Sequence, residues 1–118
     1  MLEGFVTSHA VQRAGEKIPR WRGWSEDRIR AEIIRRLPYS EIINRRDKIY
    51  SQLERGNVPC KDEMVCFMRD DVAVYVLKRK IPEKKFRVST IYFVKEFTPQ
   101  IISLGTYLNH KGYVDLTA

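Results

Sequence analysis

Two side chains near the start of the chain have the types and spacing for proton transfer beside a phosphate. His9 and Arg13 are four residues apart, and on a helix this spacing lets their side chains converge on one spot. An imidazole can accept or donate a proton near neutral pH, and a guanidinium holds phosphate oxygens in bidentate fashion. The pair therefore indicates phosphate chemistry. A histidine at the start of a helix more commonly caps or packs, and this alternative stays open.

Basic and hydroxyl-bearing side chains recur later, within segments of strand-like sequence. They are Lys78, Arg79, Arg87, Ser89, Thr90 and Tyr92. Cleavage of RNA without a metal ion needs only such groups, because a base takes the 2′-hydroxyl proton, cations stabilise the phosphate and an acid protonates the leaving oxygen. We therefore predict three catalytic residues, His9, Arg13 and Tyr92. The residues predicted to contact nucleic acid are Arg28, Arg30, Lys78, Arg79 and Arg87.

Motifs of other common active sites are absent from the sequence. It contains no GxGxxG, P-loop, HExxH or GxSxG pattern. With two histidines and no carboxylate cluster outside helices and turns, we predict no metal site and no cofactor. Asp70 and Asp71 lie between two predicted strands, where aspartate suits a turn. Cys60 and Cys66 lack zinc-ligand spacing, so we expect buried reduced thiols, with a disulfide as the alternative.

Length and charge limit the class of protein. The chain has 118 residues, which is the size of a single domain, residues 1–118. Its formal net charge of +7 favours a polyanionic partner, either nucleic acid or an acidic protein. The N-terminal segment MLEGFVTSHAVQ lacks a signal-peptide pattern, and no apolar run approaches the roughly 18 residues of a membrane span. We therefore expect a cytoplasmic protein without a membrane segment.

Three helices are predicted in the first half of the chain, over about residues 8–18, 25–37 and 40–55. Each begins at a serine or threonine, whose side-chain oxygen can accept hydrogen bonds from the free N–H groups of the first turn. Each ends near a proline or glycine. The loop at 20–24, RWRGW, carries two tryptophans that we expect to fix it to the core, with stacking on bases as the alternative.

Three strands are predicted in the second half, over about residues 63–68, 72–79 and 86–95. Their short polar connections indicate an antiparallel meander. The tail, residues 99–118, is expected to be irregular, a short helix or an edge strand. The predicted fold is α+β, with N-terminal helices packed on one face of a three- to four-stranded antiparallel sheet.

The segment 86–95, FRVSTIYFVK, is the strand most enriched in β-forming residues. Strict alternation assigns one set to the core face: Phe86, Val88, Thr90, Tyr92 and Val94. The other set, on the partly open face, is Arg87, Ser89, Ile91, Phe93 and Lys95. We expect the functional surface on the open face.

The first helix resembles that of a family of small ribonuclease toxins. In the segment TSHAVQRAGEK the similarity rests on Ser8, His9, Ala10, Arg13 and Glu16. The segments SEDRIRAEII and RVSTIYFV are similar to the second helix and a sheet strand of the RelE and BrnT toxins, in the barnase–EndoU–colicin–RelE group. The additional helix predicted after residue 38 and the loop at 20–24 depart from that family's pattern.

This resemblance implies a metal-independent endoribonuclease that inhibits translation and is neutralised by an antitoxin-like partner, for which the basic charge favours an acidic protein. By position, His9 and Arg13 would carry the activity, with Thr90 or Tyr92 contributing from the sheet.

Two other hypotheses stay open. One is a non-catalytic nucleic-acid-binding module, encoded by a phage or mobile element, that uses the exposed arginines of residues 28–46. The other is an oligomeric structural or adaptor protein that buries Ile91, Phe93 and the loop tryptophans against a second copy.

Overall fold

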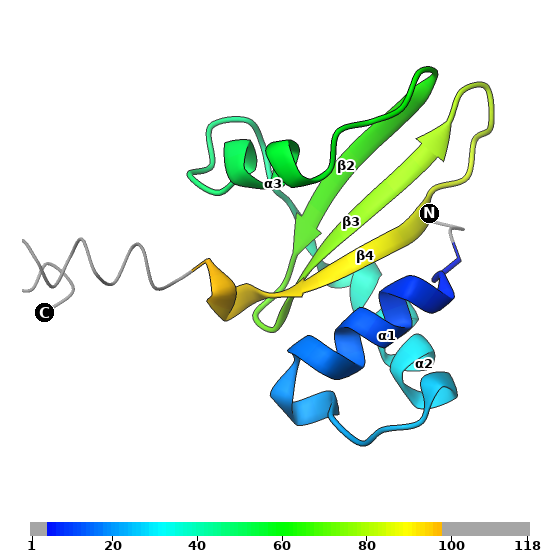
Figure 1. Ribbon diagram of the computed structural model, residues 1–118, viewed down its shortest axis with the longest axis vertical. Coiled ribbons are helices and arrows are strands. Elements are labelled where there is room, and N and C mark those ends of the chain that lie inside the picture. Colours follow the sequence, from blue (N-terminus) through cyan, green and yellow to red (C-terminus); the bar gives the residue numbers. More distant parts are fainter. Residues whose placement is uncertain (1–4, 98–118) are drawn as a thin grey trace, which may run out of the picture.

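Helices occupy the start of the chain and an antiparallel sheet its later part (Figure 1). The computed structural model describes residues 5–97, so the predicted tail, 99–118, lies outside the described residues. The α+β class is confirmed, with four antiparallel strands in the order β1-β2-β3-β4. The strands are β1 (Glu41–Ile42), β2 (Glu63–Arg69), β3 (Ala73–Lys80) and β4 (Arg87–Phe93).

Side-chain caps begin the first two helices close to their predicted starts. At the start of α1 (Ser8–Lys17), the Thr7 side-chain oxygen accepts a hydrogen bond from the Ala10 amide at 3.1 Å. Ser25 caps α2 (Glu26–Arg36) in the same way. A short 3₁₀ turn that contains a proline follows each helix. Proline lacks the amide that a continuing helix would need, so both helices stop there.

The helix predicted over residues 40–55 is wrong in its first half. Glu41–Ile42 form β1 and pair with β2, and α3 is confined to Tyr50–Gly56. Between them, the side-chain oxygens of Asn44 and Asp47 accept hydrogen bonds from amides two residues ahead, at 2.9 and 3.1 Å. These local bonds compete with helical backbone bonds, so this segment forms turns.

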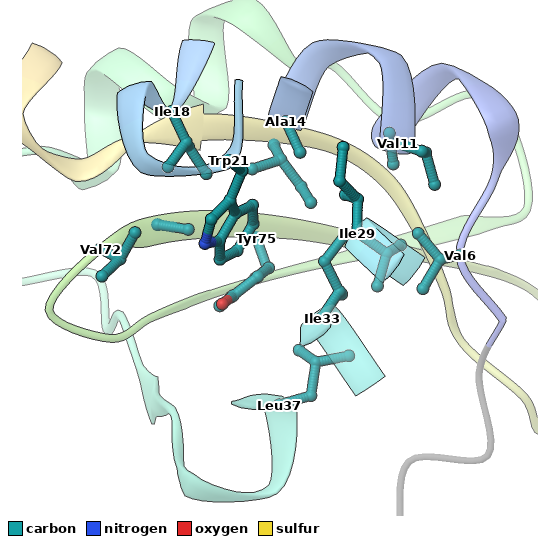
Figure 2. Close-up of a cluster of buried hydrophobic side chains, with 14 of the residues drawn as sticks. Val6, Val11, Ala14, Ile18, Trp21, Ile29, Ile33, Leu37, Val72 and Tyr75 are labelled. Atoms are coloured by element: carbon teal, nitrogen blue, oxygen red, sulfur yellow. The ribbon is translucent and has the colours of Figure 1, made fainter. Parts of the chain in front are cut away.

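Each face of the sheet has its own hydrophobic cluster. The larger one joins α1 and α2 to the sheet (Figure 2), and its members include Ile18, Trp21, Ile29, Ile33, Tyr75, Leu77 and Ile91. The smaller one joins α3 to the opposite face, through Ile43, Ile49, Leu53, Phe67, Val74, Val76 and Phe97. The expected packing of Trp21 into the core is confirmed, since its side chain is fully buried.

β4 contains one extra residue, which overturns the alternation expected for residues 86–95. Thr90 lies opposite Val76, whereas Val88 lies opposite Leu77, so Ser89 has no partner in the register. A bulge of this kind moves the following side chains to the other face. Val88 therefore shares the α1 face with Ile91, three residues later.

The predicted faces are consequently wrong beyond the bulge. Ile91 and Phe93, expected on an open face, pack in the larger cluster, whereas Tyr92 packs against the smaller one. Of the residues invoked for the oligomeric hypothesis, Ile91 and Trp21 are therefore buried in the core, and Phe93 and Trp24 are half-buried against it.

Deletion of Ser89 tests the bulge. Without Ser89, Val88 and Ile91 are two strand positions apart, so regular alternation keeps both in the core, and we expect the free energy of unfolding to fall by less than about 2 kcal/mol. Deletion of Cys66, in the regular β2–β3 ladder, would instead turn either Val65 or Phe67 to the other face and should lower it by about 3 kcal/mol or more. Chemical denaturation measures both, and equal losses would contradict the assigned register.

Glu32 links two arginines on the outer part of α2. Its Oε2 atom lies 2.6 Å from Nη2 of Arg35 and 2.7 Å from Nε of Arg36. Hydrogen bonds from Arg35 and then Arg36 lower the pKa of Glu32 from 4.5 to about 2. Arg36 also reaches Asp70 at 3.3 Å, and Asp70 accepts a hydrogen bond of 2.6 Å from the Tyr75 hydroxyl. This network ties α2 to the β2–β3 turn.

The lowered pKa of Glu32 predicts a pH dependence of stability. Because the folded state favours the carboxylate, the contribution of Glu32 is complete above pH 4.5 and is lost as the pH falls toward 2. We expect Glu32→Gln to destabilise the protein at neutral pH and to approach the unmodified protein near pH 2. Denaturation at a series of pH values measures this. A difference that stays constant with pH would contradict it, and Glu26→Gln on the same helix is the control.

Candidate functional site

α1 lies along β4, the strand at one edge of the sheet (Figure 1). Ala10 and Ala14 face the core and are fully buried, and their small side chains let the helix approach closely. His9, Arg13 and Lys17 follow one another at four-residue steps on the flank of α1 beside these alanines. The helix period therefore aligns one histidine and two cations along the edge strand.

A pocket of about 430 Å³ lies where this flank meets the sheet and the end of α3. Its lining residues are His9, Arg13, Lys17, Gly56, Asn57, Lys78, Ser89, Thr90, Ile91 and Tyr92. This set contains three basic side chains (arginine or lysine), one imidazole and three hydroxyl groups. It contains no carboxylate from residues 5–97. The pocket therefore suits an anion that also accepts hydrogen bonds.

The structure brings the three predicted catalytic residues to this one pocket. His9 and Arg13 are exposed on α1, and Tyr92 is half-buried on β4. Within residues 5–97, neither His9 nor Arg13 has an ion-pair partner or a side-chain hydrogen bond. Lys17 differs, because its ammonium lies 3.3 Å from a Glu96 carboxylate oxygen. The imidazole and the guanidinium are thus the groups best placed to meet a ligand.

Asn57, which the sequence analysis did not select, orients Tyr92. Its side-chain nitrogen donates to the Leu53 carbonyl oxygen at 2.8 Å and to the Tyr92 hydroxyl oxygen at 3.1 Å. The hydroxyl is the acceptor in the second bond, so its own proton can be donated to a ligand. The local sequence signal is weak, since Asn57 only follows the glycine that ends α3.

The five predicted nucleic-acid contacts are not all brought together. Lys78 lines the pocket, and Arg79 and Arg87 lie at the base of the hairpin between β3 and β4. Arg28 and Arg30 are on α2, outside the pocket.

Arg28 and Arg30 both contact other residues of the chain. The Arg28 guanidinium carbon lies 3.8 Å from the centre of the Trp24 ring, and Arg30 donates to the Val6 carbonyl oxygen at 3.3 Å. Trp24 in turn stacks on Trp21 at 6.0 Å. These contacts give the arginines and tryptophans of this region structural roles.

No group of histidine, cysteine or acidic side chains that could hold a metal ion occurs within residues 5–97. Cys60 and Cys66 are free thiols, and the expected burial is wrong for Cys60, which is exposed. In the same part of the chain, no helix has the length and apolar character to cross a membrane.

Comparison of the chain with protein-family models, with curated proteins and with solved structures gave no match. The resemblance to the RelE and BrnT toxins thus stays a prediction, and the function has to be argued from the pocket.

A double-mutant cycle on Asn57 and Tyr92 tests the orientation of the hydroxyl. We expect Asn57→Ala to lower the free energy of unfolding by about 1–3 kcal/mol, because buried hydrogen bonds are lost. The loss of unfolding free energy in the Asn57→Ala/Tyr92→Phe double variant should differ by about 1 kcal/mol from the sum of the two single losses. Denaturation measures all three variants. Additivity of the two changes would show that the hydrogen bond contributes nothing.

Proposed function

We propose that the protein is a metal-independent endoribonuclease of toxin-like type, with its active site in the pocket between α1 and β4. One observation above all supports this proposal. His9, Arg13 and Tyr92 line the same pocket, together with Lys78 and without a carboxylate from residues 5–97. The resemblance of α1 to that of the RelE and BrnT toxins agrees with it.

The reaction is an in-line attack of a ribose 2′-oxygen on the adjacent phosphorus. His9 accepts the 2′-hydroxyl proton as the new O–P bond forms, and Arg13 and Lys78 stabilise the charge on the non-bridging oxygens. The bond from phosphorus to the 5′-oxygen breaks, and Tyr92 donates a proton to that leaving oxygen. The products are a 2′,3′-cyclic phosphate and a free 5′-hydroxyl. Solvent returns the proton from the imidazolium to the phenolate.

An acidic protein of antitoxin-like type is the regulatory partner that we propose. The cationic lining would attract carboxylates as well as phosphates, so such a partner would compete with RNA for the pocket.

Cleavage of single-stranded RNA in the presence of EDTA tests the enzyme directly. We expect the unmodified protein to cut RNA and leave cyclic-phosphate ends, and His9→Ala to lower the rate by about 10²- to 10⁴-fold. Arg13→Ala and Tyr92→Phe should also slow cleavage. Gln12→Ala changes an exposed residue of α1 outside the pocket, and its rate should stay within about twofold.

A substrate with 2′-deoxyribose throughout removes the attacking oxygen and should not be cut. Absence of cleavage by the unmodified protein would overturn the proposal, and equal cleavage by His9→Ala would identify a contaminating nuclease.

The second candidate is a non-catalytic nucleic-acid-binding module, favoured by the pocket cations Arg13 and Lys78, which have no ion-pair partner among residues 5–97. It predicts that RNA is bound without being cut, and that Arg13→Ala weakens binding while His9→Ala does not.

A further inference from the structure

The connection between β3 and β4 carries an unusual concentration of charge. Its sequence over residues 78–87 is KRKIPEKKFR, with six basic residues and one acidic residue, a net charge of +5. The whole chain carries +7. We call residues 78–87 the basic hairpin. It lies at the end of the sheet opposite the β2–β3 turn (Figure 1).

Arg79 stabilises the basic hairpin through contacts with other residues of the hairpin. Its guanidinium donates to the Glu83 carbonyl oxygen at 2.7 Å and lies 5.3 Å from the centre of the Phe86 ring. Arg87, opposite Lys78 in the ladder, lies 3.8 Å from a Glu63 carboxylate oxygen. These two arginines therefore act as supports, which leaves Lys80 and Lys84 to meet a ligand.

Two lysines near the tip, Lys80 and Lys84, are exposed, and neither has an ion-pair partner among residues 5–97. Exposed lysines project mobile point charges that bind phosphates without demanding a fixed geometry.

The basic hairpin adjoins the pocket directly. Lys78 belongs to both, because it lines the pocket and begins the hairpin. β4 continues from Arg87 into Ser89 and Thr90, which are lining residues of the pocket. The positive charge thus extends from the pocket to the tip of the hairpin. Where the pocket receives one phosphate of a strand, the cations of the hairpin suit further phosphates along the same strand.

We infer that the basic hairpin is a second contact for single-stranded RNA, which holds the strand outside the pocket and makes binding depend on its length. This inference rests on the proposed function only in that the pocket receives a nucleic-acid phosphate. It adds a substrate class, a strand long enough to occupy both places. Contacts to phosphate position a strand without reading its sequence, so the preference is for length.

The test compares an uncleavable 2′-O-methyl trinucleotide with a longer strand of about 12 nucleotides, by fluorescence anisotropy on the full chain. The variant is Lys80→Ala/Lys84→Ala. We expect it to weaken binding of the longer strand by about 10-fold or more at low salt and to leave the trinucleotide within about twofold. The slope of log affinity against log salt should fall by about 1.4, for two phosphate contacts at roughly 0.7 each.

Two control variants locate the effect. Arg20→Ala/Lys48→Ala removes the same charge from exposed positions outside the hairpin and the pocket, and should change neither affinity by more than about twofold. Arg13→Ala, in the pocket, should weaken both ligands.

Equal weakening of both ligands by the hairpin variant, or weakening of neither, would overturn the inference. It would also fall if a poly-glutamate peptide bound as tightly as the longer strand and lost the same affinity, because the hairpin partner would then be an acidic protein. Binding is measured without cleavage. If the protein cleaves no RNA but shows the predicted length dependence of binding, the proposed enzymatic activity is refuted and the inferred RNA contact at the hairpin is supported.

Discussion

A single extra residue in β4 determines which side chains enter the core and which reach the pocket. With Ser89 outside the regular pairing, Val88 and Ile91 both pack beneath α1, and Tyr92 lies on the α3 side of the sheet. On that side it meets Asn57 at the end of α3. Strict alternation would have put Val88 and Tyr92 on one face. The bulge therefore lets one strand bury α1 and also present a hydroxyl group to the pocket, so the core and the site are specified together.

The distribution of acidic residues explains why a basic chain has a localised basic site. Carboxylates are paired with arginines that support the fold: Glu32 with Arg35 and Arg36, Asp70 with Arg36, and Glu63 with Arg87. Because their charge is offset by a nearby carboxylate, these arginines add little to the electrostatic potential outside the protein. The flank of α1 and the tip of the hairpin have few such partners among residues 5–97, so positive charge remains there. A polyanion is then steered toward one edge of the molecule.

Local signals accounted for the parts of the fold that local interactions decide. Thr7 and Ser25 cap α1 and α2 by bonds within one turn, so their positions could be predicted from sequence. The four-residue spacing of His9 and Arg13 likewise predicted a shared face of the helix.

What could not be predicted depends on contacts distant in sequence or on competition between near-equal local structures. Asn44 and Asp47 satisfy amides that a helix would have used, and this choice ended the third helix early. The bulge at Ser89 depends on the fit of β4 against β3 and α1 together, and FRVSTIYF carries no glycine to mark it. Asn57 reaches Tyr92 across 35 residues, so no spacing rule could connect them.

The free edge of β4 completes the site. The segment before α1 pairs with β4 through one residue, since the Val88 amide donates to the Phe5 carbonyl at 2.8 Å and its carbonyl accepts from the Thr7 amide at 3.1 Å. α1 begins immediately afterwards, so this bridge fixes the start of the helix one residue before the bulge. A longer pairing would run along residues 89–92 and cover the lining of the pocket. Because the helix begins where it does, its cationic flank takes the place that a fifth strand would occupy, and the pocket stays open to a ligand.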